Sequence, residues 1–199
     1  MSWRVARSLD VLRDEINAAA PNRSTVSDGS IGDAAHASRS SDHNPWVVDD
    51  DGEGVVRARD FTHDPLGGLD CDLLAERLVK LAKAGHPALG AGAYVIWEGR
   101  IASATQDGAP WDWEPYFGSN EHRKHLHVSV ATAAVGYDST RPWGVVNQED
   151  IVNKEDIDKI AEAAVAKLLA TKIEVKRGGT APVRRLSVEQ VLRETFQRS

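Results

Sequence analysis

The sequence predicts an α+β domain, with a small antiparallel sheet and helices packed on one face of that sheet. Two segments, 5–19 and 72–84, have apolar residues at helical spacing and are separated by strand-like stretches. Apolar runs on both sides of Glu98-Gly99 are typical of a β-hairpin with a tight turn. Residues 125–130 alternate between polar and apolar side chains, as a half-buried strand does.

Each element is expected from its own local pattern. The first helix has an apolar residue every three or four positions and ends at Pro21, and the second has one leucine-rich side. The Ser-, Asp- and Gly-rich loop between them is long for a compact domain, which indicates either a functional segment or one that wraps around the domain. The expected elements are a helix at 5–19, a loop at 22–54, a strand at 55–62, a helix at 72–84, hairpin strands at 94–97 and 100–103, and a strand at 125–130.

The composition changes near the end of this domain. We expect a main domain at 1–146 and a short helical tail at 147–199, because the tail contains no Trp, His or Tyr. An Ala-, Lys- and Leu-rich helix is expected at 158–171. A last helix is expected to begin at Ser187, with Gln190 completing a capping box. Packing on the domain, self-association and association with a cell wall remain open as roles of the tail.

The overall composition excludes several classes of protein. The chain has 199 residues, of which 41% are hydrophobic and 27% charged, as in soluble globular proteins. Its net charge of -6 argues against a general nucleic-acid binder. The single cysteine, Cys71, excludes an internal disulfide and a cysteine-rich zinc cluster. No apolar run is long enough for a membrane span or a secretory signal, so we expect folding in a cytoplasm.

The strand at 125–130 presents two imidazoles on one face, from His125 and His127. This arrangement suits a divalent metal, with one His as ligand and the other working beside it. His43 and Asp60 together with His127 would form a two-His, one-carboxylate zinc site. Such a site leaves a coordination position for water and is typical of catalytic zinc. A chain with seven His offers such triplets by chance, so these residue types alone leave ordinary polar roles open.

Several sequence blocks between about residues 30 and 145 carry a family resemblance. They are Ser41-Asp42-His43-Asn44-Pro45, Gly54-Val55-Val56-Arg57-Ala58-Arg59-Asp60, Thr62-His63-Asp64-Pro65, Tyr94-Val95-Ile96-Trp97, and Tyr116 to Asn120 running into Lys124 to Val130. In this order they resemble the zinc peptidases that cut bacterial cell-wall peptides, namely the D-alanyl-D-alanine carboxypeptidase group and the penicillin-insensitive murein endopeptidase. Within this group the chain looks closest to the peptidase domains of endolysins from phages of actinobacteria.

The resemblance implies that His43, Asp60 and His127 bind zinc, in a cleft on the sheet face opposite the helices. Zinc held in this way supplies hydroxide at neutral pH and polarises a carbonyl, and amide hydrolysis needs both. The segment 44–59 between the first two ligands is longer than in the relatives. A loop excursion must therefore bring these two ligands together.

The related peptidases differ from one another in their catalytic residues. Many relatives have a carboxylate three residues before the last ligand, where this chain has Lys124. The murein endopeptidase has His at the positions matching His122 and His125, and either is competent as a proton shuttle. We expect His125 to be the proton shuttle, because it shares the metal-facing side of the strand. His122 is the second candidate, and its alternative role is that of a solvated loop residue. Arg39 would hold a substrate carboxylate or the oxyanion, or form a surface ion pair, and Ser41 would contact substrate or form a turn.

Other polar and aromatic residues have two interpretations. His63 and Asp64 could orient a ligand or cap the turn at Pro65. His86 is expected at the surface. The acidic loop 49–54 partly resembles a calcium loop, and a solvated acidic turn is the alternative. Four aromatic residues could line a groove for glycan and peptide, although at least half of them are expected in the core. These are Trp111, Trp113, Tyr116 and Trp143.

The sequence thus predicts a zinc peptidase that hydrolyses an amide bond in the peptide part of bacterial peptidoglycan. The resemblance implies a bacteriophage endolysin, made in the host cytoplasm and acting on the cell wall during host cell lysis after release by a partner such as a holin. Two alternatives stay open: a D-Ala-D-Ala carboxypeptidase of wall metabolism, and a non-catalytic wall-binding or virion module with the same fold. The bond that is cut and the oligomeric state are not determined by the sequence.

Overall fold

The structure is a computed structural model that describes residues 2–31, 41–105, 109–145, 154–175 and 184–190. The chain divides into two compact units, Met1–Asn147 and Gln148–Ser199. The boundary after Asn147 lies one residue beyond the boundary expected from the composition, which followed residue 146.

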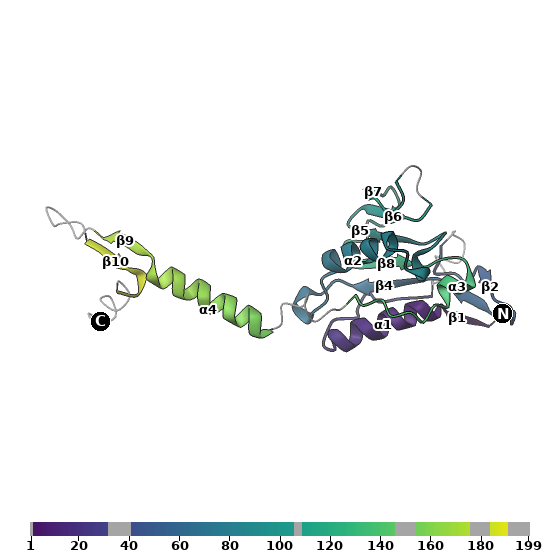
Figure 1. The fold of residues 1–199 in the computed structure, drawn as a ribbon, viewed down its shortest axis with the longest axis horizontal. Coiled ribbons are helices and arrows are strands. Elements are labelled where there is room, and N and C mark those ends of the chain that lie inside the picture. Colours follow the sequence, from purple (N-terminus) through teal and green to yellow (C-terminus); the bar gives the residue numbers. More distant parts are fainter. Residues whose placement is uncertain (1, 32–40, 106–108, 146–153, 176–183, 191–199) are drawn as a thin grey trace. The chain divides into compact units, whose positions relative to one another are not determined.

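A five-stranded sheet forms the centre of the first unit (Figure 1). Its strands run in the order β4 (Ala58–Thr62), β8 (His125–Ser129), β5 (Tyr94–Trp97), β6 (Arg100–Ser103) and β7 (Glu114–Pro115). All neighbouring pairs are antiparallel. Strand β8 lies between β4 and β5, so the histidine strand is hydrogen-bonded on both sides. In this register Asp60 pairs directly with His127, which places the two side chains on the same face of the sheet.

Two helices cover the opposite face of this sheet. Helix α1 spans Arg7–Ala19, and helix α2 spans Cys71–Lys83 and packs on β5 and β8 (Figure 1). The Asp70 side chain caps α2 by accepting hydrogen bonds from the backbone N–H groups of Asp72 and Leu73. The apolar strand residues that join the helices in one core are Phe61, Val95, Trp97, Leu126 and Val128. The predicted fold class, α+β with helices on one face of a small antiparallel sheet, is confirmed.

A second, smaller sheet differs from the sequence prediction. It consists of β1 (Trp3–Val5), β3 (Gly54–Val56) and β2 (Val47–Val48), in the order β1-β3-β2. The single strand expected at 55–62 is wrong in detail, because the chain leaves the small sheet at Arg57 and enters the large one at Ala58. The Arg57 backbone pairs outside both strands: its N–H donates to the Asp42 carbonyl, and its carbonyl accepts from Val130. Strand β1 was not expected; it pairs in parallel with β3 and delays the start of α1 to Arg7.

The hairpin between β5 and β6 forms as predicted. Both turn residues have left-handed backbones, with φ values of 47° at Glu98 and 71° at Gly99, as a type I′ turn requires. Three short helical segments complete the unit. They are η1 (Pro65–Gly67), η2 (Pro87–Leu89) and α3 (Ala134–Tyr137).

The expected surface position of His86 is wrong. Its side chain is buried, and its ring stacks on Trp143 with 4.4 Å between ring centroids. The Gly-His-Pro sequence around it is typical of a surface loop. The partner that buries it comes from the far end of the unit, so no local pattern indicates the contact.

The second unit contains α4 (Lys154–Ala170) and an antiparallel hairpin of β9 (Lys172–Val175) and β10 (Arg184–Ser187). The helix was expected and the hairpin was not. The predicted capping box is present: the Ser187 N–H donates to Gln190 Oε1 at 2.9 Å, and the Gln190 N–H donates to Ser187 Oγ at 3.2 Å. The rest of the predicted last helix lies outside the described residues. Among the described helices of both units, none is long and apolar enough to cross a membrane.

Candidate metal centre

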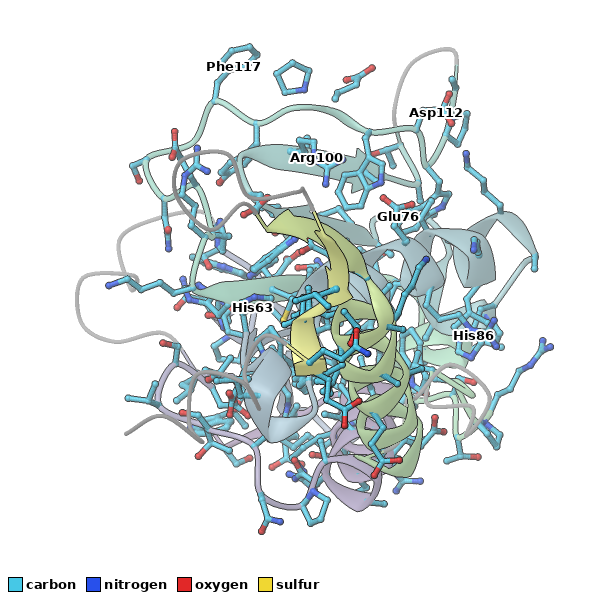
Figure 2. All side chains as sticks on the ribbon, turned by 90° about the vertical axis from the view of Figure 1, so that its left-hand side faces the viewer. His63, Glu76, His86, Arg100, Asp112 and Phe117 are labelled. Carbon is cyan, nitrogen blue, oxygen red and sulfur yellow. The ribbon has the colours of Figure 1, made fainter. Side chains whose placement is uncertain are left out.

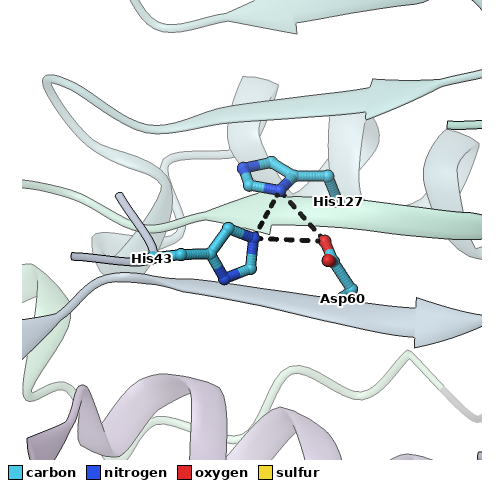
Figure 3. A group of neighbouring side chains, drawn as sticks. All are labelled: His43, Asp60 and His127. Carbon is cyan, nitrogen blue, oxygen red and sulfur yellow. Dashed lines mark hydrogen bonds and ion pairs between the residues drawn. The ribbon is translucent and has the colours of Figure 1, made fainter. Parts of the chain in front are cut away.

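Three side chains converge on the sheet face opposite the helices (Figure 3). His43 Nε2 lies 3.2 Å from His127 Nδ1 and 3.4 Å from Asp60 Oδ1, and the last two atoms are 3.0 Å apart. Zinc bonds of about 2.0–2.2 Å in a tetrahedral arrangement place neighbouring ligand atoms about 3.3–3.6 Å apart. The triangle therefore has nearly the size that a small divalent cation requires, and the three residues could hold a metal ion. They are the three ligands named from the sequence.

The outer nitrogens of both imidazoles have hydrogen-bond partners that suit a lone pair facing the triangle. His43 Nδ1 lies 2.8 Å from the Ser30 carbonyl oxygen, which can only accept, so this nitrogen carries a hydrogen and Nε2 presents its lone pair inward. His127 Nε2 lies 3.0 Å from Ser129 Oγ, and donation there leaves Nδ1 as the inward acceptor. Two lone pairs and a carboxylate oxygen then face one another and need a positive charge between them. Metal-binding His residues usually have such outer hydrogen bonds.

A tight turn carries His43 to the sheet. The Asn44 N–H donates to the Ser41 carbonyl at 2.9 Å, and the His43 N–H lies 3.3 Å from Ser41 Oγ. The Arg57 guanidinium binds the Asp42 carboxylate, and the Arg57 backbone N–H donates to the Asp42 carbonyl at 3.1 Å. The long segment between the first two ligands thus folds out as the β2–β3 hairpin and returns beside its starting point. This is the excursion that the ligand spacing required.

The acidic loop at the tip of this hairpin is a capped turn. The Asp49 carboxylate accepts backbone hydrogen bonds from Asp51 at 3.2 Å and Glu53 at 2.9 Å, and it forms an ion pair with Arg4 at 3.0 Å. Asp60, which would be the last ligand of a calcium loop, faces the histidines instead. The geometry favours the acidic-turn interpretation of residues 49–54 over a calcium site.

Residues 28–30 lie along the outer edge of β4. Asp28 accepts hydrogen bonds from the Thr62 N–H at 2.8 Å and from Arg23 Nη2 at 2.6 Å. Gly29 exchanges backbone hydrogen bonds with the metal-facing Asp of β4, and the next carbonyl, of Ser30, reaches the His43 ring. From its sequence this segment is predicted only as a loop, because Ser and Gly give no sign of which strand edge they cover.

The charges in the triangle stabilise one another. Burial alone raises the pKa of Asp60, but in the metal-free protein the interactions with His127 and His43 outweigh burial and lower that pKa well below its usual range. Burial also lowers the pKa of His43, and the Asp60 carboxylate reverses the effect and raises it. Asp60 therefore stays ionised at neutral pH. Its side chain is 18% exposed and that of His125 is 17% exposed, so solvent reaches the centre on this side.

Two further imidazoles border the same carboxylate. His125 Nε2 lies 3.7 Å from Asp60 Oδ2. The His122 ring lies 5.1 Å from that of His125 and 5.3 Å from that of His127, measured between centroids. His122 is only 9% exposed, so the alternative of a solvated loop residue is wrong. The structure places both proton-shuttle candidates beside the three residues that could hold a metal ion.

The β5–β6 turn holds the loop that carries His122. The Gly99 N–H donates to the Glu121 carbonyl at 2.7 Å, and the Glu98 N–H lies 3.3 Å from the His122 carbonyl. Asn120 Oδ1 accepts from the His122 N–H at 3.0 Å, and His122 has a left-handed backbone with φ of 53°. A distant hairpin thus turns the imidazole inward, which could not be read from the local sequence.

Burial keeps both shuttle candidates neutral. Burial, together with the charge of His127, lowers the pKa of His122 to about 4. Burial also lowers the pKa of His125, and the neighbouring histidines add to this effect while Asp60 opposes it. Neutral imidazoles have a lone pair available for a proton. The Nδ1 atoms of both residues are buried without a hydrogen-bond partner among the described residues.

The remaining residues named from the sequence have other positions. Arg39 lies outside the described residues. The Ser41 hydroxyl lies within its own turn, as the turn interpretation expects. His63 Nδ1 accepts from the Cys71 N–H at 3.1 Å, at the start of α2. The Asp64 carboxylate accepts from the Gly67 N–H and so caps η1.

The aromatic residues divide between the core and the rim of the centre. Trp111 and Trp143 are buried in the core. The Tyr116 ring lies 5.8 Å from that of His122, and the neighbouring Phe117 is 93% exposed at the outer end of its loop (Figure 2). Tyr94 was not predicted to belong to the site, but its ring stacks on that of His127 with 5.3 Å between centroids. The strand period could have indicated this contact, because Tyr94 shares the metal-facing side of its strand.

Comparison with models of known protein families, with curated proteins and with solved structures finds no match to this chain. The centre is therefore interpreted from its own geometry and chemistry and from the sequence blocks described above.

Proposed function

We propose that this protein is a zinc-dependent peptidase that hydrolyses an amide bond in the peptide part of bacterial peptidoglycan, as a bacteriophage endolysin. The observation that carries the proposal is the triangle of His43, Asp60 and His127, with its ligand atoms 3.0–3.4 Å apart. The sequence blocks that resemble cell-wall zinc peptidases contain these same residues and supply the substrate class.

The donor set favours zinc over other common cations. Two imidazoles and one carboxylate suit zinc, whereas calcium and magnesium prefer oxygen ligands. When bound, zinc polarises the substrate carbonyl and lowers the pKa of water to about 7. The set has a single negative charge, from Asp60, so the loaded centre keeps a net positive charge that stabilises a developing oxyanion.

The proton transfers fall to His125. Its imidazole is neutral, lies on the solvent-exposed side of the centre, and has Nε2 3.7 Å from Asp60 Oδ2. A neutral imidazole there can take the proton of the attacking water and pass it to the leaving amine. His122 is more deeply buried and packs edge-on against the His125 ring, so it positions the shuttle. Lys124, which replaces the carboxylate of many relatives, is exposed.

Hydrolysis of purified peptidoglycan tests the proposal. We expect release of new amino groups that stops after complete chelation and returns with stoichiometric zinc. Asp60→Asn should abolish release, whereas the same change at the exposed Asp112, which pairs with Lys83 away from the centre, should leave it intact. Release that survives full metal removal would contradict the zinc mechanism.

Mass spectrometry of the released fragments identifies the bond. Cross-bridge or stem fragments support an endolysin. Release of terminal D-alanine alone would assign the carboxypeptidase alternative, and wall binding without any release would assign the non-catalytic module.

A further inference from the structure

Asp60 has one carboxylate oxygen that the first triangle does not use. Oδ1 faces His43 and His127, and Oδ2 faces His125 Nε2 at 3.7 Å. Asp60, His122 and His125 form a second group in which one ligand atom from each lies within 4.8 Å of the others. A carboxylate shared in this way has one oxygen for each of two neighbouring cations.

The second group also contains buried nitrogens that have no partner. The Nδ1 atoms of His122 and His125 are buried and make no hydrogen bond among the described residues. His122 is more than nine-tenths buried, at 9% exposure. Burying a polar atom without a partner costs free energy, so such atoms usually await a ligand, a proton or water.

We propose that Asp60, His122 and His125 form a second, weaker divalent-cation site, which takes zinc beside the first site when zinc is abundant. Paired metal sites with ions about 3.5–4 Å apart are common in hydrolytic proteins, and a shared carboxylate fits that arrangement. Two imidazoles and a carboxylate again form a zinc-type donor set.

The second ion binds more weakly because the two sites share one negative charge. The first ion already neutralises Asp60. Two doubly charged ions repel each other about four times as strongly as two single charges at the same separation. Zinc therefore fills the sites in two separate steps.

Filling the second site inhibits hydrolysis; this consequence rests on the proposed function. The second ion occupies the imidazole lone pairs that would otherwise carry protons. Zinc then activates the metal-free protein at low concentration and inhibits it at high concentration.

A zinc-binding isotherm of the full chain, measured by titration calorimetry and equilibrium dialysis, tests the site without reference to activity. We expect two zinc ions per wild-type chain, bound in separate steps. His122→Asn should keep the first step and weaken the second by at least about 100-fold, the upper end of what loss of a supporting hydrogen bond costs. Asn is chosen because it tolerates the left-handed backbone at this position. His125→Asn is the second variant, should the first fail to fold.

The matched control is Glu121→Gln, which removes an exposed potential ligand next to His122 and should leave both steps unchanged. Saturation of the wild type at one zinc ion, or a second step that persists in both His variants, would overturn the site. Two binding steps with no loss of hydrolysis at high zinc would overturn the inhibitory role. Absence of any hydrolysis would count against the proposed function only, because the isotherm still decides the site.

Discussion

Ser129→Ala isolates the outer hydrogen bond of His127, one of the three proposed metal ligands. Ser129 is fully buried on β8, and its Oγ lies 3.0 Å from His127 Nε2. Without this hydroxyl the His127 ring loses the outer hydrogen bond that suits an inward lone pair at Nδ1, while His43 and Asp60 are not substituted. Loss of such a supporting partner typically lowers metal affinity by about 10–100-fold, which corresponds to about 1.4–2.7 kcal/mol. The substitution removes a single oxygen, so little packing is lost.

Competition with a chromophoric chelator measures this change in zinc affinity. Ser103→Ala is the matched control, because Ser103 lies on β6, two strands away from β8, and its hydroxyl lies 3.1 Å from the Thr105 hydroxyl. The free energy of unfolding of the metal-free Ser129→Ala variant should lie within about 1.5 kcal/mol of the wild-type value, because one hydrogen bond usually contributes no more than this. Zinc affinity unchanged within about threefold would refute the claim that Ser129 orients the ligand, since a tautomer effect of that kind acts through this bond.

Three further predictions concern the surroundings of the centre. Arg57→Met breaks the buried ion pair with Asp42 that holds the His43 turn. The substitution should lower the free energy of unfolding, measured in urea, by about 3–5 kcal/mol and should also weaken zinc binding. His122 has a folded-state pKa of about 4, below its unfolded value of 6.5, so the metal-free protein should lose about 3 kcal/mol as the pH falls from 6.5 to 4. His122→Asn should flatten this part of the pH profile, and an unchanged slope would contradict its burial as a neutral group. Trp143→Ala should lower the free energy of unfolding by about 3–5 kcal/mol and lower the melting temperature, because Trp143 is 1% exposed and stacks on His86.

Strand periodicity was enough to predict one side of the centre. The alternation at 125–130 placed His125 and His127 on the face opposite the core, and the structure has them there. The hairpin turn at Glu98-Gly99 was also readable, because its residues must adopt left-handed backbones.

Other parts of the site depend on contacts between distant segments. The ion pair of Arg57 with Asp42 closes the excursion that brings His43 to Asp60, and neither residue carries a local sign of its partner. Ser30 contributes only its carbonyl oxygen, which every residue has, so its role depends on the edge that Asp28 anchors.

The inward turn of His122 shows the same limit. Its loop is polar and contains an Asn and charged residues, which is the usual pattern of a solvated surface. The Glu98 and Gly99 amides hold the loop against the sheet, and burial of the imidazole follows from that contact. A local pattern indicates which residues share a strand face, whereas long-range hydrogen bonds decide which loops close over it.

Anomalous diffraction at the zinc edge, from crystals of the full chain loaded with one equivalent of zinc, tests the central claim most directly. The account predicts one strong peak about 2.0–2.2 Å from His43 Nε2, His127 Nδ1 and an Asp60 carboxylate oxygen. A peak bound elsewhere, with the His43 and His127 rings too far apart to share one ion, would contradict it.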